Sequence, residues 1–92
     1  MHLTLPVDGF RLAYERVGHG PAVVLLHGWP GDRSDYREVV PLVSAAADVV
    51  VPDLRRFGES DKQPADPAGQ YSADAHARSI VGLIEELVSN GR

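Results

Sequence analysis

The chain has 92 residues, no cysteine and a formal net charge of −4 from 9 basic and 13 acidic side chains. The absence of cysteine excludes disulfides, a thiol nucleophile and thiolate metal sites. The net negative charge argues against binding to nucleic acid or to an anionic membrane surface. Because the longest apolar run is only residues 22–26 and the start lacks a secretion signal, we expect a cytoplasmic chain that spans no membrane.

Two strands joined by a tight turn are expected at the start of the chain. Residues 3–7 and 10–17 flank Asp8-Gly9, a dipeptide that is favoured in β-hairpin turns. After a glycine-rich break, residues 22–26 are continuously apolar. The absence of alternation is typical of a strand covered on both faces, as in a parallel sheet.

A helix and a second buried strand are expected next. Ser34 is placed to cap a helix over residues 35–45, although Pro41 interrupts its pattern. Residues 49–51 are again continuously apolar and are followed closely by Asp53. Strand, helix and strand form a βαβ unit, whose crossover should be right-handed.

A long loop and a second helix complete the expected elements. Residues 54–70 are rich in glycine and proline and predict an ordered loop. Ser72 then caps a helix from residue 73 to about residue 90, with Gly91 beyond its end. Its expected apolar stripe is formed by Ala73, Ala77, Ile80, Ile84 and Leu87. The sequence therefore predicts an α/β fold of about four strands and two helices: an amino-terminal hairpin, a βαβ unit and a further helix.

The loop that follows the first buried strand is a candidate functional loop. It reads His27-Gly28-Trp29-Pro30-Gly31, and ligands of open α/β sheets bind at the carboxyl ends of the strands. Gly28 admits unusual backbone conformations and Pro30 fixes its own φ, so together they can aim the Trp29 N–H into a cleft as one oxyanion donor. The alternative is that glycine and proline only shape a turn on which Trp29 packs.

A second motif, from Asp53 to Ser60, follows the next buried strand. His-Gly-x-Pro after one strand and Asp-x-Arg-x-x-Gly-x-Ser after the next resemble the α/β-hydrolase superfamily. The Trp29-Pro30-Gly31 sequence, with residues 61–64 downstream, is most similar to its epoxide-hydrolase and dehalogenase branch. The resemblance covers essentially the whole chain.

The resemblance assigns roles to individual residues. It implies that the Trp29 backbone N–H donates to the oxyanion site. It also implies loop-shaping roles for His27, Gly28, Pro30, Asp53, Arg55 and Ser60. Members of the family usually have glycine where this chain has Arg56; if that position needs a left-handed backbone, an arginine costs about 1–2 kcal/mol.

The nucleophile motif of the family is absent. Neither G-x-S-x-G nor G-x-D-x-G occurs, so we expect residues 1–92 to be the amino-terminal portion of a single α/β-hydrolase domain, truncated before the nucleophile elbow and inactive in isolation. The resemblance implies a full-length parent that opens a small-molecule epoxide without a cofactor. A parent that is a haloalkane or haloacetate dehalogenase, or a serine esterase, remains open.

Other classes of function are also compatible with parts of the sequence. The spacing of Gly28 and Asp53 suits a Rossmann-type nucleotide-binding module, but Trp29 and Pro30 stand where a pyrophosphate needs small residues and free N–H groups. A non-catalytic interaction fragment would self-associate through the unpaired edge of the strand at residues 22–26. No spacing of histidines or acids indicates a metal site.

A catalytic triad within the chain is not expected. His27, Asp53 and Ser60 are the only such trio at strand ends, and neither the serine nor the histidine has the local sequence of a nucleophile elbow or its base. We expect His76 to be structural and Tyr71 to be a packing residue.

Overall fold

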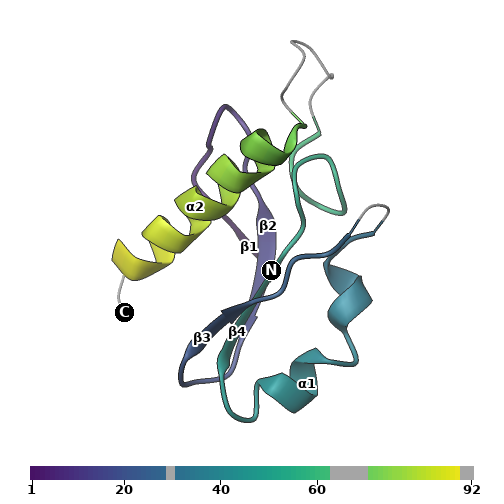
Figure 1. Ribbon diagram of the computed structural model, residues 1–92, viewed down its shortest axis with the longest axis vertical. Coiled ribbons are helices and arrows are strands. Elements are labelled where there is room, and N and C mark those ends of the chain that lie inside the picture. Colours follow the sequence, from purple (N-terminus) through teal and green to yellow (C-terminus); the bar gives the residue numbers. More distant parts are fainter. Residues whose placement is uncertain (29–30, 63–70, 90–92) are drawn as a thin grey trace.

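The computed structural model describes residues 1–28, 31–62 and 71–89, which form a mixed sheet with helices on both sides (Figure 1). The sheet has the order β1-β2-β4-β3. The strands are β1 (His2–Leu3), β2 (Ala13–Val17), β3 (Ala22–Val24) and β4 (Asp48–Pro52), and the helices are the 3₁₀-helix η1 (Arg33–Tyr36), α1 (Val40–Val43) and α2 (Ala73–Ser89). The predicted α/β architecture is confirmed.

The amino-terminal hairpin turns at the predicted dipeptide. Asp8 and Gly9 both have positive φ, 54° and 84°, as a type I′ turn requires, and Val7 and Phe10 form a bridge across it. The predicted strand at residues 3–7 is wrong in extent, since β1 is only His2–Leu3. Pro6 has no N–H to donate to a strand ladder, which limits the pairing of this segment.

The strand β4 lies in the centre of the sheet. It pairs antiparallel with β2 and parallel with β3, and Val49, Val50 and Val51 are at most 2% exposed. The expectation of a strand covered on both faces is correct for β4 and wrong for β3, where Ala22 is exposed and Val23 and Val24 are half-buried. In the part of the chain that the structure describes, β3 pairs on one side only, so its outer edge is uncovered.

The predicted helix at residues 35–45 is replaced by two short helices, η1 and α1. The cap is Asp32 rather than Ser34, because the Asp32 carboxylate accepts a hydrogen bond of 2.9 Å from the Ser34 N–H. Pro41 lies in the first turn of α1. A proline lacks the N–H that a continuous helix would need at this position, so a new helix begins next to the proline, at Val40, instead of one helix running through it.

The helix α2 begins where the sequence predicts. The Ser72 hydroxyl oxygen caps it by accepting a hydrogen bond of 3.1 Å from the Ala75 N–H. The buried stripe, however, consists of Ala75, Ser79 and Leu83. The predicted stripe is wrong at Ala73, Ala77 and Ile84, which are exposed. The predicted end at Gly91 lies outside the described residues.

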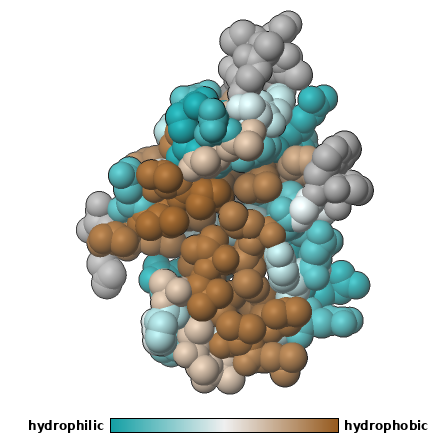
Figure 2. All heavy atoms as spheres, viewed as in Figure 1, coloured by the Kyte–Doolittle hydropathy of each residue, from teal (hydrophilic) through white to brown (hydrophobic). Residues whose placement is uncertain are grey.

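Two apolar clusters hold the layers together, one on each face of β4. Tyr14, Val50 and Leu83 pack between the sheet and α2, whereas Val49 and Val51 pack with Ala47 on the side of η1 and α1. Figure 2 shows a continuous apolar band running from α2 across to β3 and α1. No helix within the described ranges is long and apolar enough to cross a membrane.

Candidate functional site

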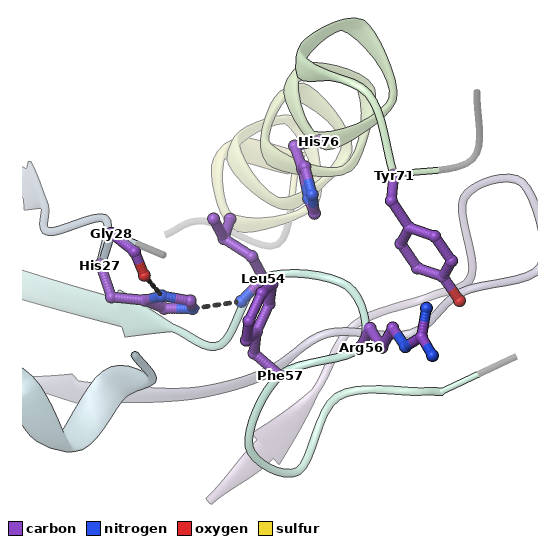
Figure 3. A pocket seen from close by; sticks show the side chains of 7 residues that line it. All are labelled: His27, Gly28, Leu54, Arg56, Phe57, Tyr71 and His76. Atoms are coloured by element: carbon purple, nitrogen blue, oxygen red, sulfur yellow. Dashed lines mark hydrogen bonds between the residues drawn. The ribbon is translucent and has the colours of Figure 1, made fainter. Parts of the chain in front are cut away.

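The loops that follow β3 and β4 meet at the carboxyl ends of these parallel strands. His27 is 5% exposed, and its Nε2 accepts a hydrogen bond of 2.9 Å from the Leu54 N–H. Its Nδ1 lies 2.8 Å from the carbonyl oxygen of Gly28 (Figure 3). An acceptor at Nε2 requires the proton on Nδ1, which donates to that carbonyl. The imidazole therefore fixes the position of Gly28 relative to the second loop.

Asp53 joins the second loop to η1. Its carboxylate is fully buried, accepts hydrogen bonds from the N–H groups of Arg33 (2.6 Å) and Glu59 (2.9 Å), and forms an ion pair with the Arg33 guanidinium. Gly58 has a φ of 52°, and a Cβ added there would lie 2.2 Å from Asp53 Oδ2. The glycine of the motif is thus needed for the close approach of this carboxylate.

Ser60 connects the second loop to β2. Its hydroxyl donates to the Asp53 carbonyl oxygen at 2.5 Å and accepts from the Ala13 N–H at 2.8 Å. Because His27 is bonded to Leu54 instead, the described geometry gives the serine no base. The full burial of Asp53 likewise removes the acid that a Rossmann module would offer to a ribose.

Arg55 connects the second loop to the hairpin turn and to α2. The guanidinium is fully buried, donates to Ser79 Oγ at 2.6 Å and to Asp8 Oδ2 at 2.8 Å, and lies 4.7 Å from the centre of the Phe10 ring. Hydrogen bonds from Arg55 and then from Arg78 hold the pKa of the Asp8 carboxyl below its usual value. One arginine thus fastens the hairpin turn and α2 to the candidate site.

A pocket of about 670 Å³ opens beside these loops. It is lined by His27, Gly28, Leu54, Arg56, Phe57, Tyr71 and His76 (Figure 3). The His27 and Phe57 rings contact each other edge to face, with centroids 5.2 Å apart. The wall of the pocket is therefore built from the two motifs together with the start of α2.

Two lining residues, Tyr71 and His76, lie outside both motifs and were not predicted as site residues from the sequence. Burial lowers the pKa of His76, and its Nδ1 is buried with no hydrogen-bond partner among the described residues. Tyr71 immediately precedes the Ser72 cap, so the start of α2 brings its ring to the pocket. The position of Tyr71 directly before the helix cap is the sequence feature from which its place in the pocket could have been predicted.

Trp29 and Pro30 lie outside the described residues, so the oxyanion donor stays a prediction. Their neighbour Gly28 is described and lines the pocket. In the described part of the chain, no group of three or more histidine, aspartate and glutamate side chains could hold a metal ion.

A second hollow of about 790 Å³ lies against the opposite face of the sheet. Residues of β2, η1 and α1 line it, together with Asp53 and Glu59. Its Arg33 forms ion pairs with Glu15, Asp53 and Glu59. None of the described residues of the His27 loop, which are His27, Gly28 and Gly31, lines this hollow.

Comparison with known proteins matches residues 21–92 to the model of the alpha/beta hydrolase fold. The chain is 39% identical over 86 residues to a soluble epoxide hydrolase of Corynebacterium sp. (strain C12), covering 94% of this chain and 29% of that protein. It is 37% identical over 83 residues to a haloalkane dehalogenase of Bradyrhizobium diazoefficiens, covering 88% and 26%.

A solved structure agrees with these sequence matches. A thermophilic esterase from Thermogutta terrifontis has a TM-score of 0.80 and 36% identity, over 97% of this chain and 32% of its own. The chain thus spans less than a third of the length of each of these three proteins. The family match over residues 21–92 and the two interlocked strand-end loops lead to one conclusion: the chain belongs to the α/β-hydrolase fold family.

Proposed function

We propose that this chain forms the amino-terminal part of an epoxide-hydrolase-like enzyme and supplies one side of its oxyanion hole. The observation that supports this role is the hydrogen bond from Leu54 to His27, which holds Gly28 at the edge of the pocket. The N–H of Trp29, the next residue, is then the proposed donor. The similarity to the epoxide hydrolase of Corynebacterium supports epoxides as the proposed substrate class.

The proposed chemistry has two covalent steps. A carboxylate nucleophile opens the epoxide and forms an ester, and a water activated by a base then hydrolyses that ester. Backbone donors stabilise the negative charge that develops on the oxygen. In this proposal the nucleophile, acid and base come from sequence beyond this chain, the substrate is a small molecule, no cofactor takes part, and the enzyme is cytoplasmic.

A chimeric enzyme tests the proposal. The segment of the Corynebacterium epoxide hydrolase that matches this chain is replaced by residues of this chain, and hydrolysis of styrene oxide is measured. Trp29→Pro, which removes the N–H, should lower the rate by about 10²–10³, whereas Trp29→Ala retains the donor and should cost much less. The 92-residue chain alone should not accelerate hydrolysis.

Two results would contradict the proposal. The first is a folded chimera without activity, because the segment would then fail to supply its share of the site. The second is an equal effect of Trp29→Pro and Trp29→Ala, which would assign the role to the indole instead of the backbone. Circular dichroism of each variant confirms that the comparison is between folded proteins.

Dehalogenation is a second candidate, supported by the similarity to the haloalkane dehalogenase of Bradyrhizobium diazoefficiens. Any coding sequence beyond Arg92 would separate the nucleophile types, since G-x-D-x-G suits epoxide or carbon–halogen chemistry and G-x-S-x-G suits an esterase. Epoxide hydrolysis and halide release, measured on the protein with that sequence included, then distinguish the first two.

A further inference from the structure

Arg56 lies in the pocket although its backbone conformation is unfavourable for arginine. Its φ is 75°, in the left-handed region that favours glycine, and its side chain lines the pocket. Its N–H donates to the Asp61 carbonyl oxygen at 2.9 Å, which fixes this backbone conformation. Strained residues of this kind concentrate at functional sites, so the outlier indicates a role for the side chain.

The guanidinium of Arg56 is available to a ligand. It lies 5.3 Å from the centre of the Tyr71 ring and makes no ion pair with any residue that the structure describes. No acidic side chain lines the pocket among the described residues. The Arg56 guanidinium is therefore positioned by the Tyr71 ring, while no carboxylate among the described residues neutralises its charge.

The pocket has two chemically different ends. Figure 3 shows His27 and Gly28 at one end and Tyr71 and Arg56 at the other, with Leu54 and Phe57 between them. The ring of His76 points from α2 toward this middle region, and its buried Nδ1 lacks a partner among the described residues. A molecule lying along the pocket would have an apolar body and polar groups at both ends.

We propose that Arg56 makes the pocket select substrates that carry a carboxylate opposite the reacting group. The planar guanidinium matches a carboxylate with two parallel hydrogen bonds, the apolar middle accommodates an aromatic or aliphatic body, and the reacting group lies at Gly28. Because this inference names the substrate class of the same pocket, it rests on the proposed function. Its test measures binding, which does not require catalysis.

Binding of benzoate and of the neutral benzamide to the ¹⁵N-labelled 92-residue chain is followed by NMR. Benzoate should shift the amide signals of Gly28, Phe57 and His76, and Arg56→Gly should weaken its binding about two- to fivefold. Arg56→Lys keeps the charge but loses the paired donors of the guanidinium, so it should retain only part of the affinity. Benzamide binding should change little in either variant, and high salt should weaken only benzoate binding.

Several outcomes would overturn the inference. These are equal binding of benzoate and benzamide, no binding of either, or the same benzoate affinity in Arg56→Gly as in the original chain. If Arg56→Gly does not fold, Arg56→Gln removes the charge while retaining a long side chain and decides in its place.

Turnover by the chimera separates this inference from the proposed function. With 4-(oxiran-2-yl)benzoate as substrate, Arg56→Gly should raise KM about two- to fivefold, whereas KM for styrene oxide should change less. Equal effects on both epoxides would leave the proposed function standing and overturn the carboxylate preference. Absence of turnover with both substrates would count against the proposed function, and the benzoate titration would still decide the inference.

Discussion

At the scale of single residues, Arg56 combines an unfavourable backbone with a side chain in the pocket. A left-handed conformation brings the Cβ of a non-glycine residue too close to the neighbouring carbonyl oxygen. Stability and ligand selection are therefore expected to oppose each other at this position. Because the family usually has glycine at this position, the sequence predicts a free-energy cost for arginine if the backbone is left-handed. The φ of 75° confirms that the backbone is left-handed.

Arg56→Gly should raise the free energy of unfolding by about 1–2 kcal/mol, because glycine adopts this φ without a steric penalty. Urea denaturation followed by circular dichroism measures the change. The matched control is Arg37→Gly, since Arg37 has a φ of −59° and glycine should be slightly destabilising there. A lower stability for Arg56→Gly would contradict the assignment of strain.

Asp8 should make stability depend on acid pH. Its pKa is lowered by the hydrogen bonds from Arg55 and Arg78, so its contribution is present above pH about 4 and is lost as the pH falls through the lower pKa of the folded state. Protonation leaves the buried Arg55 without its carboxylate. The melting temperature should therefore fall more steeply below pH about 4 in the original chain than in Asp8→Asn.

Thermal unfolding from pH 7 to pH about 2 checks this expectation. Asparagine tolerates the positive φ of Asp8, so the variant removes the charge while the turn is kept. Glu38→Gln removes an exposed carboxylate and controls for net charge. Parallel acid profiles for Asp8→Asn and the original chain would show that the ion pair does not govern acid stability.

The site residues illustrate what a sequence reveals at this scale. Asp53, Arg55 and Ser60 can be located because they sit in a recognisable motif at a strand end. Their partners cannot, since Arg55 binds Asp8, 47 positions earlier, and Ser79, 24 positions later. Pairings of this kind depend on how the turn and the helix pack, which no local spacing encodes.

At the scale of elements, α2 shows where a periodic pattern misleads. The predicted stripe counts only apolar residues, whereas the buried stripe includes Ser79, which bonds the buried Arg55. A polar residue at the centre of the packed face shifts the apparent apolar face around the helix. The short helices before β4 depart from prediction for another reason, because Pro41 lies in the first turn of α1 and Asp32 caps η1.

Leu83→Ala should lower the free energy of unfolding by about 2–5 kcal/mol, because Leu83 is fully buried against Tyr14 and Val50. Ile84→Ala is the matched control on the same helix and should cost far less, because Ile84 is 43% exposed. Equilibrium urea unfolding compares the two variants. A larger loss of unfolding free energy for Ile84→Ala would support the apolar stripe predicted from the sequence.

At the scale of the whole molecule, the exposed edge of β3 is an expected site of self-association. Hydrogen bonds at Pro21 and Leu25 face β4, so the backbone groups of Ala22 and Val24 face away from it. Unpaired strand edges beside apolar surface template pairing with another chain. The apolar band across this side adds contact area, and Leu26 is 44% exposed.

Size-exclusion chromatography of the purified chain should show species larger than a monomer. Ala22→Lys places a charge on the β3 edge and should shift the chain toward the monomer, whereas Leu3→Lys, on the opposite edge strand β1, should not. A folded, monomeric original chain would contradict the expectation. So would an equal effect of the two lysines.

The two ion pairs of Asp8 also set an order of events during synthesis. This carboxylate is made early, whereas its partners Arg55 and Arg78 follow 47 and 70 residues later. A nascent chain can close the hairpin turn by itself, because the turn needs only local contacts. It cannot complete both ion pairs of Asp8 until Arg78 in α2 has been translated. The last long helix of this chain thus secures its first turn.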